Sequence, residues 1–132
     1  MFSHEKLHVY QRSTQWFALS IEIVKALPKG NADLGNQLRR AALSIPLNIA
    51  EGAGKTGKSD KRRFYGIARG STLECAAILD AIKILGFSEK SELESGKDLL
   101  REIAAMLSSL VLKWEVHAQG GGEAQVHAQA KG

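Results

Sequence analysis

Cysteine and long apolar runs are scarce in this sequence, and each scarcity excludes a class of protein. The 132 residues include one cysteine, Cys75, so no disulfide forms within the chain. The longest apolar stretch, residues 103–112, contains two serines and is far shorter than the roughly 18 apolar residues of a membrane span. Glu5 and Lys6 place charge at the start, unlike a secretion signal. We therefore expect a soluble, cytoplasmic protein without a membrane segment.

Proline and strand-like alternation are also scarce. Pro28 and Pro46 are the only prolines, and no window alternates polar and β-branched residues for long enough to predict a strand. Hydrophobic residues make up 44% of the chain, which is sized for one domain with a modest core rather than for a multidomain enzyme. The sequence therefore predicts an all-α domain.

Apolar residues recur at intervals of three, four and seven along four segments, which is the spacing of amphipathic helices. The segments cover residues 7–26, 33–52, 60–85 and a stretch that opens at residue 88 or 91. Long helices with short connections most simply form an antiparallel, up-and-down four-helix bundle, here over residues 1–117. Pro46 predicts a kink in the second helix rather than a break, because the apolar positions keep their phase across it.

The third segment carries two apolar faces. The seam expected to enter the core consists of Phe64, Ala68, Ser71, Cys75, Ile78, Ile82 and Leu85. A second face, the outer stripe, consists of Gly66, Gly70, Leu73, Ala77 and Ile84. A monomeric bundle should be polar there, so the outer stripe predicts an interface between copies of the chain. The alternative is that a bend or a tilted fourth helix covers it within one subunit.

Beyond residue 117 the composition changes to Gly, Ala, Gln and His, and the run Val-His-Ala-Gln at 116–119 recurs at 126–129. This change predicts a disordered tail over residues 118–132.

Residues 52–59 read GAGKTGKS, which matches the phosphate-binding pattern G-x-x-x-x-G-K-[ST] letter for letter. That loop works where a strand delivers its glycines beneath a helix N-terminus, with an aspartate from a neighbouring strand for magnesium. Here a helix precedes the motif and no strand is expected. We therefore interpret the motif as a flexible turn between helices, and not as a nucleotide triphosphatase site.

Positive charge is concentrated around this turn. Residues 32–69 carry a net charge of +5, whereas residues 70–132 carry −3. Three cations fall in the first turn of the third helix, where the helix dipole disfavours them, so local stability does not explain their position. Phosphates that dock on the turn and the helix N-terminus together would explain it.

The predicted nucleic-acid-binding residues are Arg39, Arg40, Lys55, Lys58, Lys61, Arg62 and Arg63. Few aromatic residues interleave with them, so we expect contact with the phosphate backbone rather than base stacking. The alternative is a solvated basic turn that only aids solubility.

The remaining candidates predict neither catalysis nor metal binding. Asn48 and Glu51 lie one helical turn apart, but Asn48 occupies a seam position, where a buried amide commonly fixes helix register. We therefore interpret this pair as structural polar residues. His4 and His8 lack acidic or cysteine partners that could complete a metal site. The sequence predicts a non-enzymatic protein without cofactor or metal.

Residues 37–52, QLRRAALSIPLNIAEG, are followed by the basic turn and by FYGIARGS at 64–71 with Glu74. These stretches resemble the four-helix-bundle protein family encoded in intervening sequences of bacterial 23S ribosomal RNA genes. The resemblance covers residues 5–115. It implies an up-and-down bundle and, by similarity to family members and to the accessory variability protein of diversity-generating retroelements, a ring-shaped homopentamer with basic surfaces.

The sequence leaves two candidate functions. The first is a homo-oligomer whose repeated cationic surface binds RNA or DNA phosphates. The second is an oligomeric scaffold that recruits a protein partner, with the basic turn matching an acidic surface on that partner.

Overall fold

The computed structural model describes the backbone of residues 1–131 and the side chains of residues 1–115, and this part of the chain contains helices and no strand. In chain order the elements are η1 (Ser3–Lys6), α1 (His8–Lys25), α2 (Ala32–Gly54), α3 (Lys58–Leu85) and α4 (Lys90–Lys131). The all-α class and the four helices are confirmed. The disordered tail predicted over residues 118–132 lies outside the residues whose side chains are described, and stays a prediction.

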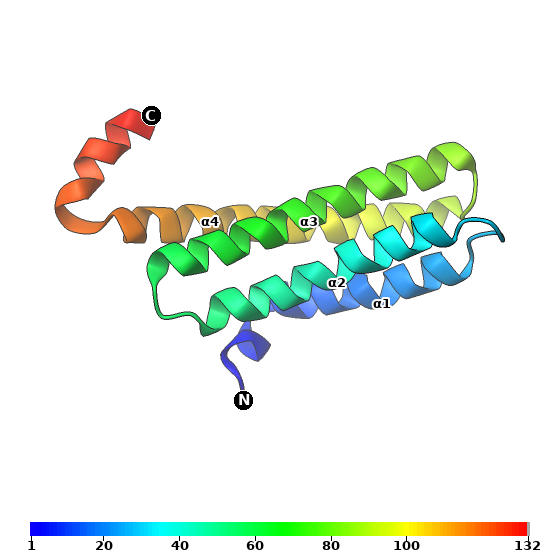
Figure 1. Cartoon of the computed structure of the whole chain (residues 1–132), viewed down its shortest axis with the longest axis horizontal. Coiled ribbons are helices and arrows are strands. Elements are labelled where there is room, and N and C mark those ends of the chain that lie inside the picture. The colour runs from blue at the N-terminus through cyan, green and yellow to red at the C-terminus, as the bar shows by residue number, and fades with distance from the viewer. Residues whose placement is uncertain (132) are drawn as a thin grey trace.

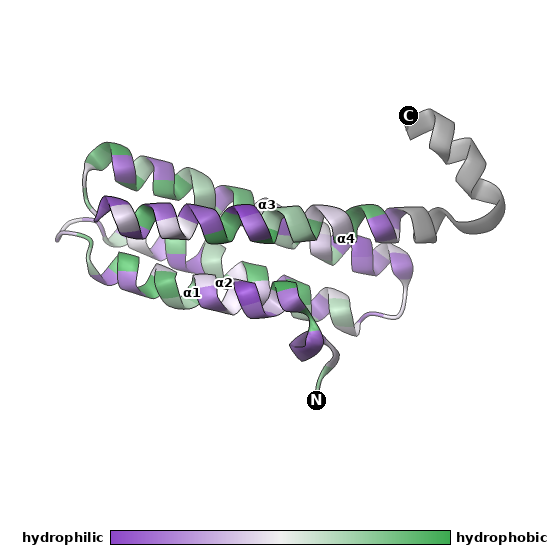
Figure 2. Cartoon of the chain, turned by 180° about the vertical axis from the view of Figure 1, so that it is seen from behind, coloured by the Kyte–Doolittle hydropathy of each residue, from purple (hydrophilic) through white to green (hydrophobic). Residues whose placement is uncertain are grey.

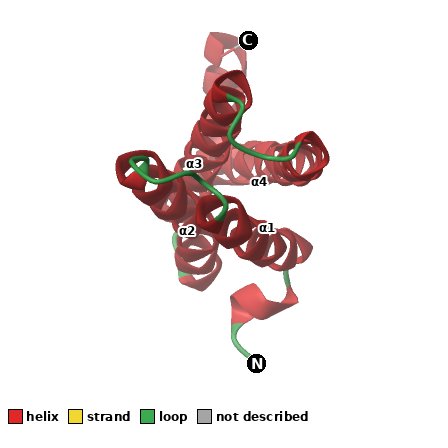
Figure 3. Ribbon diagram, turned by 90° about the vertical axis from the view of Figure 1, so that its right-hand side faces the viewer, coloured by secondary structure: helices red, strands yellow, loops and turns green. Residues whose placement is uncertain are grey.

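The four long helices lie side by side along one axis, joined by turns at alternate ends (Figure 1). Each helix packs against its neighbours in the chain, and α1 also packs against α4. The helices therefore surround a single core of buried residues. Figure 3 shows the arrangement of the helices viewed along the bundle axis. The α1–α2 and α3–α4 turns share one end of the bundle, and the α2–α3 turn, residues 55–57, lies at the other.

One glycine in the left-handed region ends α3, and another lies in the α1–α2 turn. Gly30, after α1, has a φ of 92°, and Gly86, after α3, has a φ of 73°. The amides of Gly86 and Phe87 both donate to the carbonyl of Ile82, at 3.0 and 3.3 Å, which satisfies a free carbonyl at the end of α3. By contrast, α2 continues through the buried Pro46, and the predicted kink there stays a prediction.

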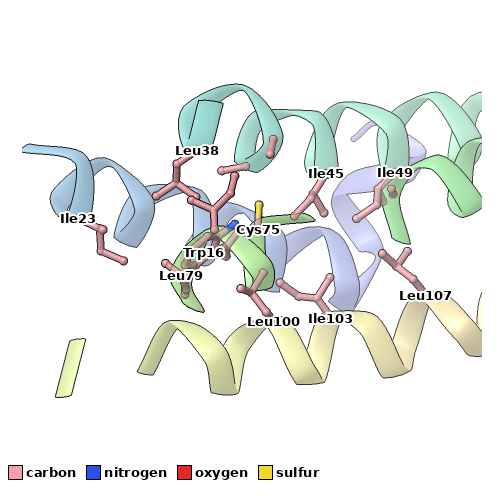
Figure 4. Packing of buried hydrophobic residues seen from close by; sticks show 14 of the residues in the cluster. Trp16, Ile23, Leu38, Ile45, Ile49, Cys75, Leu79, Leu100, Ile103 and Leu107 are labelled. Carbon is pink, nitrogen blue, oxygen red and sulfur yellow. The ribbon is translucent and has the colours of Figure 1, made fainter. Parts of the chain in front are cut away.

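Each helix turns an apolar stripe toward the core, so apolar and polar residues alternate along the ribbon in Figure 2. On α1 the residues spaced seven apart are buried, as the sequence predicts: Val9, Trp16 and Ile23 are 3%, 0% and 0% exposed. Trp16 lies at the centre of the bundle near Cys75 (Figure 4). Burial raises the pKa of the Cys75 thiol to about 12, so Cys75 stays protonated at neutral pH.

Three fully buried hydroxyl groups lie within this apolar core. Ser13 donates to the carbonyl of Tyr10 at 2.7 Å, Ser20 to that of Phe17 at 2.6 Å and Thr72 to that of Ala68 at 2.9 Å. A buried hydroxyl without a partner costs several kcal/mol by order of magnitude. Because each helix satisfies its own hydroxyls, these residues fit the core without a polar network.

The predicted seam of α3 is wrong on one of its two rows. Ala68, Cys75, Ile78 and Ile82 are buried as expected, but the rest of the second row is replaced by residues one position later, Tyr65, Thr72 and Leu79. Phe64 and Ser71 are only half-buried, and Leu85 is 51% exposed. A strict repeat of seven drifts by about 20° per repeat on a straight helix, so two adjacent rows are hard to separate over 28 residues.

Gly96 of α4 provides a test of this packing. A Cβ atom there would lie 2.9 Å from Cζ3 of Trp16 and 3.0 Å from Cδ1 of Leu79, both of which are buried and unable to move away. We expect Gly96→Ala to lower the free energy of unfolding by about 1–3 kcal/mol in urea titrations, despite the better helix propensity of alanine.

Gly54→Ala is the matched control, because nothing lies within 4 Å of a Cβ atom at Gly54. This variant should be as stable as the parent protein or slightly more stable. Equal stability of the two alanine variants would contradict the packing of α4 on Trp16.

Candidate nucleic-acid interface

The α2–α3 turn gathers four cations at one end of the bundle: Lys55, Lys58, Arg62 and Arg63, here called the turn cluster. Lys58 and Arg62 are exposed and have no carboxylate within ion-pair distance among the described side chains. Lys55 pairs with Glu51 and Arg63 with Asp60, each at 3.7 Å and each within one helical turn. Such solvent-exposed pairs contribute about 0–1 kcal/mol, so an incoming phosphate can compete for both cations.

Lys61 differs from the turn cluster because its ammonium group is directed back onto the protein. Its Nζ donates to the carbonyls of Gly52 and Ala53, both at 3.1 Å, and lies 5.4 Å from the ring centroid of Trp114. Partial burial, and then the nearby charge of Lys113, lower the pKa of Lys61. Lys61 therefore ties the end of α2 to α3 and α4, and is not a freely presented phosphate ligand.

Two aromatic rings lie among these cations. The Phe64 ring has Lys55 Nζ at 5.3 Å and Arg63 Cζ at 4.4 Å from its centroid. The Trp114 ring has Lys113 Nζ at 4.9 Å, in addition to Lys61. Sequence reasoning missed Trp114 and Lys113, because they come from the far part of α4, and only the packing of α4 beside α3 brings them to the turn.

The first turn of α3 also offers amide donors. Gly57 precedes the helix without a side-chain cap, and the first amide with a backbone acceptor is that of Lys61, which donates to Gly57 at 3.0 Å. The amides of Lys58, Ser59 and Asp60 thus lack the internal acceptors that later residues have. Free amides beside side-chain cations are the combination that binds phosphate at helix N-termini.

The motif GAGKTGKS at residues 52–59 spans the end of α2, the turn and the start of α3. A helix, not a strand, leads into it, so the geometry of a phosphate-binding loop does not form. Its first glycine has a packing role instead, because a Cβ atom on Gly52 would lie 2.9 Å from Cε1 of Tyr65.

Arg39 and Arg40 do not join the turn cluster. They are exposed on the first half of α2, and the fifteen residues from Arg40 to Lys55 correspond to roughly 22 Å of helix. The structure therefore divides the seven predicted nucleic-acid-binding residues into the turn cluster, the arginine pair and the inward-directed Lys61.

Asn48 is half-buried where α2 meets α3. Its Nδ2 donates to the carbonyl and to Oγ of Ser44, at 2.8 and 3.0 Å, and Ser44 Oγ lies 2.8 Å from Ser71 Oγ. These bonds link the two helices through hydroxyl groups rather than through the Asn48 amide itself. Glu51 is exposed and pairs with Lys55, not with Asn48.

The outer stripe of α3 is open in the isolated subunit. Leu73 is 48% exposed and Ile84 84% exposed, and nothing lies within 4 Å of a Cβ atom built on Gly66 or Gly70. Ala77 is exposed as well. Neither a bend nor the described part of the fourth helix covers this face, which removes the alternative explanation for its apolar character.

The described residues contain no helix with the length and apolar character needed to cross a bilayer. Within the same residues, no three His, Cys, Asp or Glu side chains come together as a metal-binding group. His4 packs against the rings of Phe2 and Tyr10, and His8 lies 3.9 Å from Glu102.

Lys61 and Arg62 are adjacent cations with different structural surroundings, which allows a paired test. We expect Lys61→Gln to lower the free energy of unfolding by about 1–2 kcal/mol, because it removes two charge-assisted hydrogen bonds. Arg62→Gln should change stability by less than about 0.5 kcal/mol. Thermal and urea unfolding of both variants measures the difference, and equal effects would show that Lys61 does not hold the turn.

Most of the sequence is similar to a known protein family. A search of curated proteins finds no match to the chain. A family model described as 23S rRNA-intervening sequence protein matches residues 5–109. This match includes α1–α3, the basic turn and the first part of α4, and it confirms the resemblance seen in the sequence. The chain therefore belongs to the 23S rRNA-intervening sequence protein family.

Proposed function

We propose that this protein is a non-enzymatic, homo-oligomeric nucleic-acid-binding protein, whose turn cluster contacts phosphates of RNA or DNA. The observation that carries the proposal is the exposure of Lys58 and Arg62 without carboxylate partners among the described side chains, beside the free amides of the α3 N-terminus. Cations placed this way stabilise neither α3 nor the turn. They have a clear role once a polyanion binds.

The surroundings of the turn cluster support phosphate contact. Burial first, and then the nearby charge of Lys113, lower the pKa of Lys61, so positive charge is concentrated at this end of the bundle. The family description refers to an intervening sequence of 23S rRNA, which makes a structured RNA the first ligand to test.

Salt dependence tests the phosphate contacts. We expect the affinity for a structured RNA to fall steeply with salt. Replacing Lys58, Arg62 and Arg63 by Gln should lower the slope of log K against log salt by about 0.9 for each duplex phosphate that the protein no longer neutralises. Fluorescence anisotropy between low and physiological salt measures both slopes.

The matched control replaces Lys83, Lys90 and Arg101 by Gln. These three residues are exposed on α3 and α4, away from the α2–α3 turn, and their replacement removes the same net charge. The control should keep almost the full slope. If both triple variants reduce the slope by the same amount, the effect is one of net charge and the turn cluster is not the interface.

For the oligomer, we propose a homopentamer assembled through the outer stripe. Leu73 and Ile84 expose apolar surface beside two helical glycines that have open space above them. Glycine costs about 1 kcal/mol relative to alanine in a helix, and close approach of a second backbone offsets that cost. A ring repeats the turn cluster in every subunit, which raises the avidity for a long polyanion.

A charge at Gly70 tests this interface. Gly70→Glu leaves the isolated subunit without a clash, because nothing lies within 4 Å of its Cβ position. We expect the helical circular dichroism to persist while the mass from light scattering falls to that of one subunit. Ala105→Glu on an exposed site of α4 is the control and should keep the oligomer. An unchanged mass for Gly70→Glu would place any interface elsewhere.

The alternative function is an oligomeric scaffold that recruits a protein partner without binding nucleic acid. The exposed apolar side chains of Leu43, Leu47 and Ile67, at 41%, 56% and 42%, favour this alternative because they lie beyond the outer stripe. A complex that survives nuclease treatment and depends on these residues supports it.

A further inference from the structure

A hollow lies between α1 and α2, away from the turn cluster. Its volume is about 640 Å³, and its apolar lining comes from Phe17 of α1 and Leu43 of α2. Its polar lining comes from Asp33, Arg39 and Arg40, with the amide side chains at 36 and 37. This volume falls within the roughly 300–1,000 Å³ typical of small-molecule sites.

The charged groups around this hollow have no partners among the described side chains. No hydrogen bond or ion pair joins Asp33, Arg39 or Arg40 to another of these side chains. Asp33, Arg39 and Arg40 nevertheless line one space, beside the half-buried Phe17. The arrangement therefore offers a stacking face, two cations and one anionic acceptor to the same ligand.

Two further hollows continue from this one toward the α1–α2 turn. One, of about 330 Å³, shares Arg39 and Asn36 with the first and is lined by Val24 and Leu27. The other, of about 290 Å³, shares Arg39 and Phe17 and is lined by Lys25. Arg39 lines all three hollows, which are together called the groove.

We propose that this groove binds one unstacked nucleotide, with the base against Phe17 and the phosphate between Arg39 and Arg40. A base stacked on an aromatic ring and a phosphate held by guanidinium groups are the two contacts that single strands use most. This inference rests on the proposed nucleic-acid binding and extends it, because it assigns the arginine pair a site separate from the turn cluster. The nucleotide comes either from a single-stranded segment or from solution.

Asp33 gives this site a preference among bases. A carboxylate accepts hydrogen bonds but donates none, so it favours a base with an exocyclic amino group. Cytosine carries this amino group, whereas uracil carries an oxygen at the same position. The site should therefore prefer cytidine over uridine, and Asp33→Asn should remove the preference.

Charge complementarity argues against a helix of a second subunit as the occupant. An apolar helix face would bury Asp33, Arg39 and Arg40 without partners, and each buried unpaired charge is costly. A nucleotide instead supplies an anion for the arginines and donors for the carboxylate.

The test measures binding of labelled six-residue oligocytidine and oligouridine, and of cytidine monophosphate, to the full chain at fixed low salt. Phe17→Leu should weaken oligocytidine binding roughly 5- to 150-fold, because it removes the ring and keeps an apolar side chain. Phe17→Tyr keeps an aromatic ring and should bind oligocytidine as well as the parent protein does. Replacing both Arg39 and Arg40 by Gln should lower the slope of log K against log salt by about 0.7 for each phosphate contact that is lost.

Controls separate this site from the turn cluster and from assembly. Lys83→Gln with Lys90→Gln should leave oligocytidine binding unchanged. If oligocytidine binds more tightly than cytidine monophosphate, the nucleotide in the groove comes from a single strand. If the two bind equally, it is a free nucleotide. The proposal is overturned if Phe17→Leu binds normally, or if the Phe17 and arginine variants change the mass from light scattering, which would make the groove a subunit interface.

Failure of the groove proposal is distinguishable from failure of the proposed function. If only the replacements at Lys58, Arg62 and Arg63 affect binding of structured RNA, the turn cluster remains the interface and the groove does not contribute. If neither set affects any nucleic acid, both proposals fail.

Discussion

The ammonium group of Lys61 connects the three parts of the protein that form its basic end. It belongs to the first turn of α3, donates to the last carbonyls of α2 and lies over Trp114 of α4. This position disfavours the charged form of the ammonium group, which lowers the pKa of Lys61. The hydrogen bonds of Lys61 hold the short turn between α2 and α3 at both ends. The neighbouring cations therefore extend outward from a fixed backbone.

This constraint explains why adjacent basic residues have different roles. Lys61 stabilises the turn, whereas Arg62 extends into solvent from the next position of the helix. A helix rotates by about 100° per residue, so neighbours in the sequence face different surroundings. The arginine pair of α2 is separated from the turn by several helical turns and belongs to a groove with α1. The positive charge in the middle of the chain thus corresponds to two surfaces with different geometry.

The helices and most of the core could be predicted because they depend on local periodicity. Trp16 and Ile23 lie where the repeat of seven places them. The row of α3 that contains Tyr65 was missed, because a strict repeat of seven drifts around a straight helix, and packing against α2 and α4 decides which row is buried. Trp114 was missed at the basic turn for a related reason, since its position depends on how α4 lies beside α3. The groove at Phe17 also requires knowing which faces of α1 and α2 meet.

Hydrogen–deuterium exchange with and without a saturating structured RNA measures whether the first turn of α3 contacts the nucleic acid. The amides of Lys58, Ser59 and Asp60 lack internal acceptors at the start of α3, so they exchange quickly in the free protein. We expect slower exchange in peptides from residues 54–64 when RNA is bound, and unchanged exchange across residues 83–94. Unchanged exchange at residues 54–64 in an RNA-saturated protein would contradict the proposed contact.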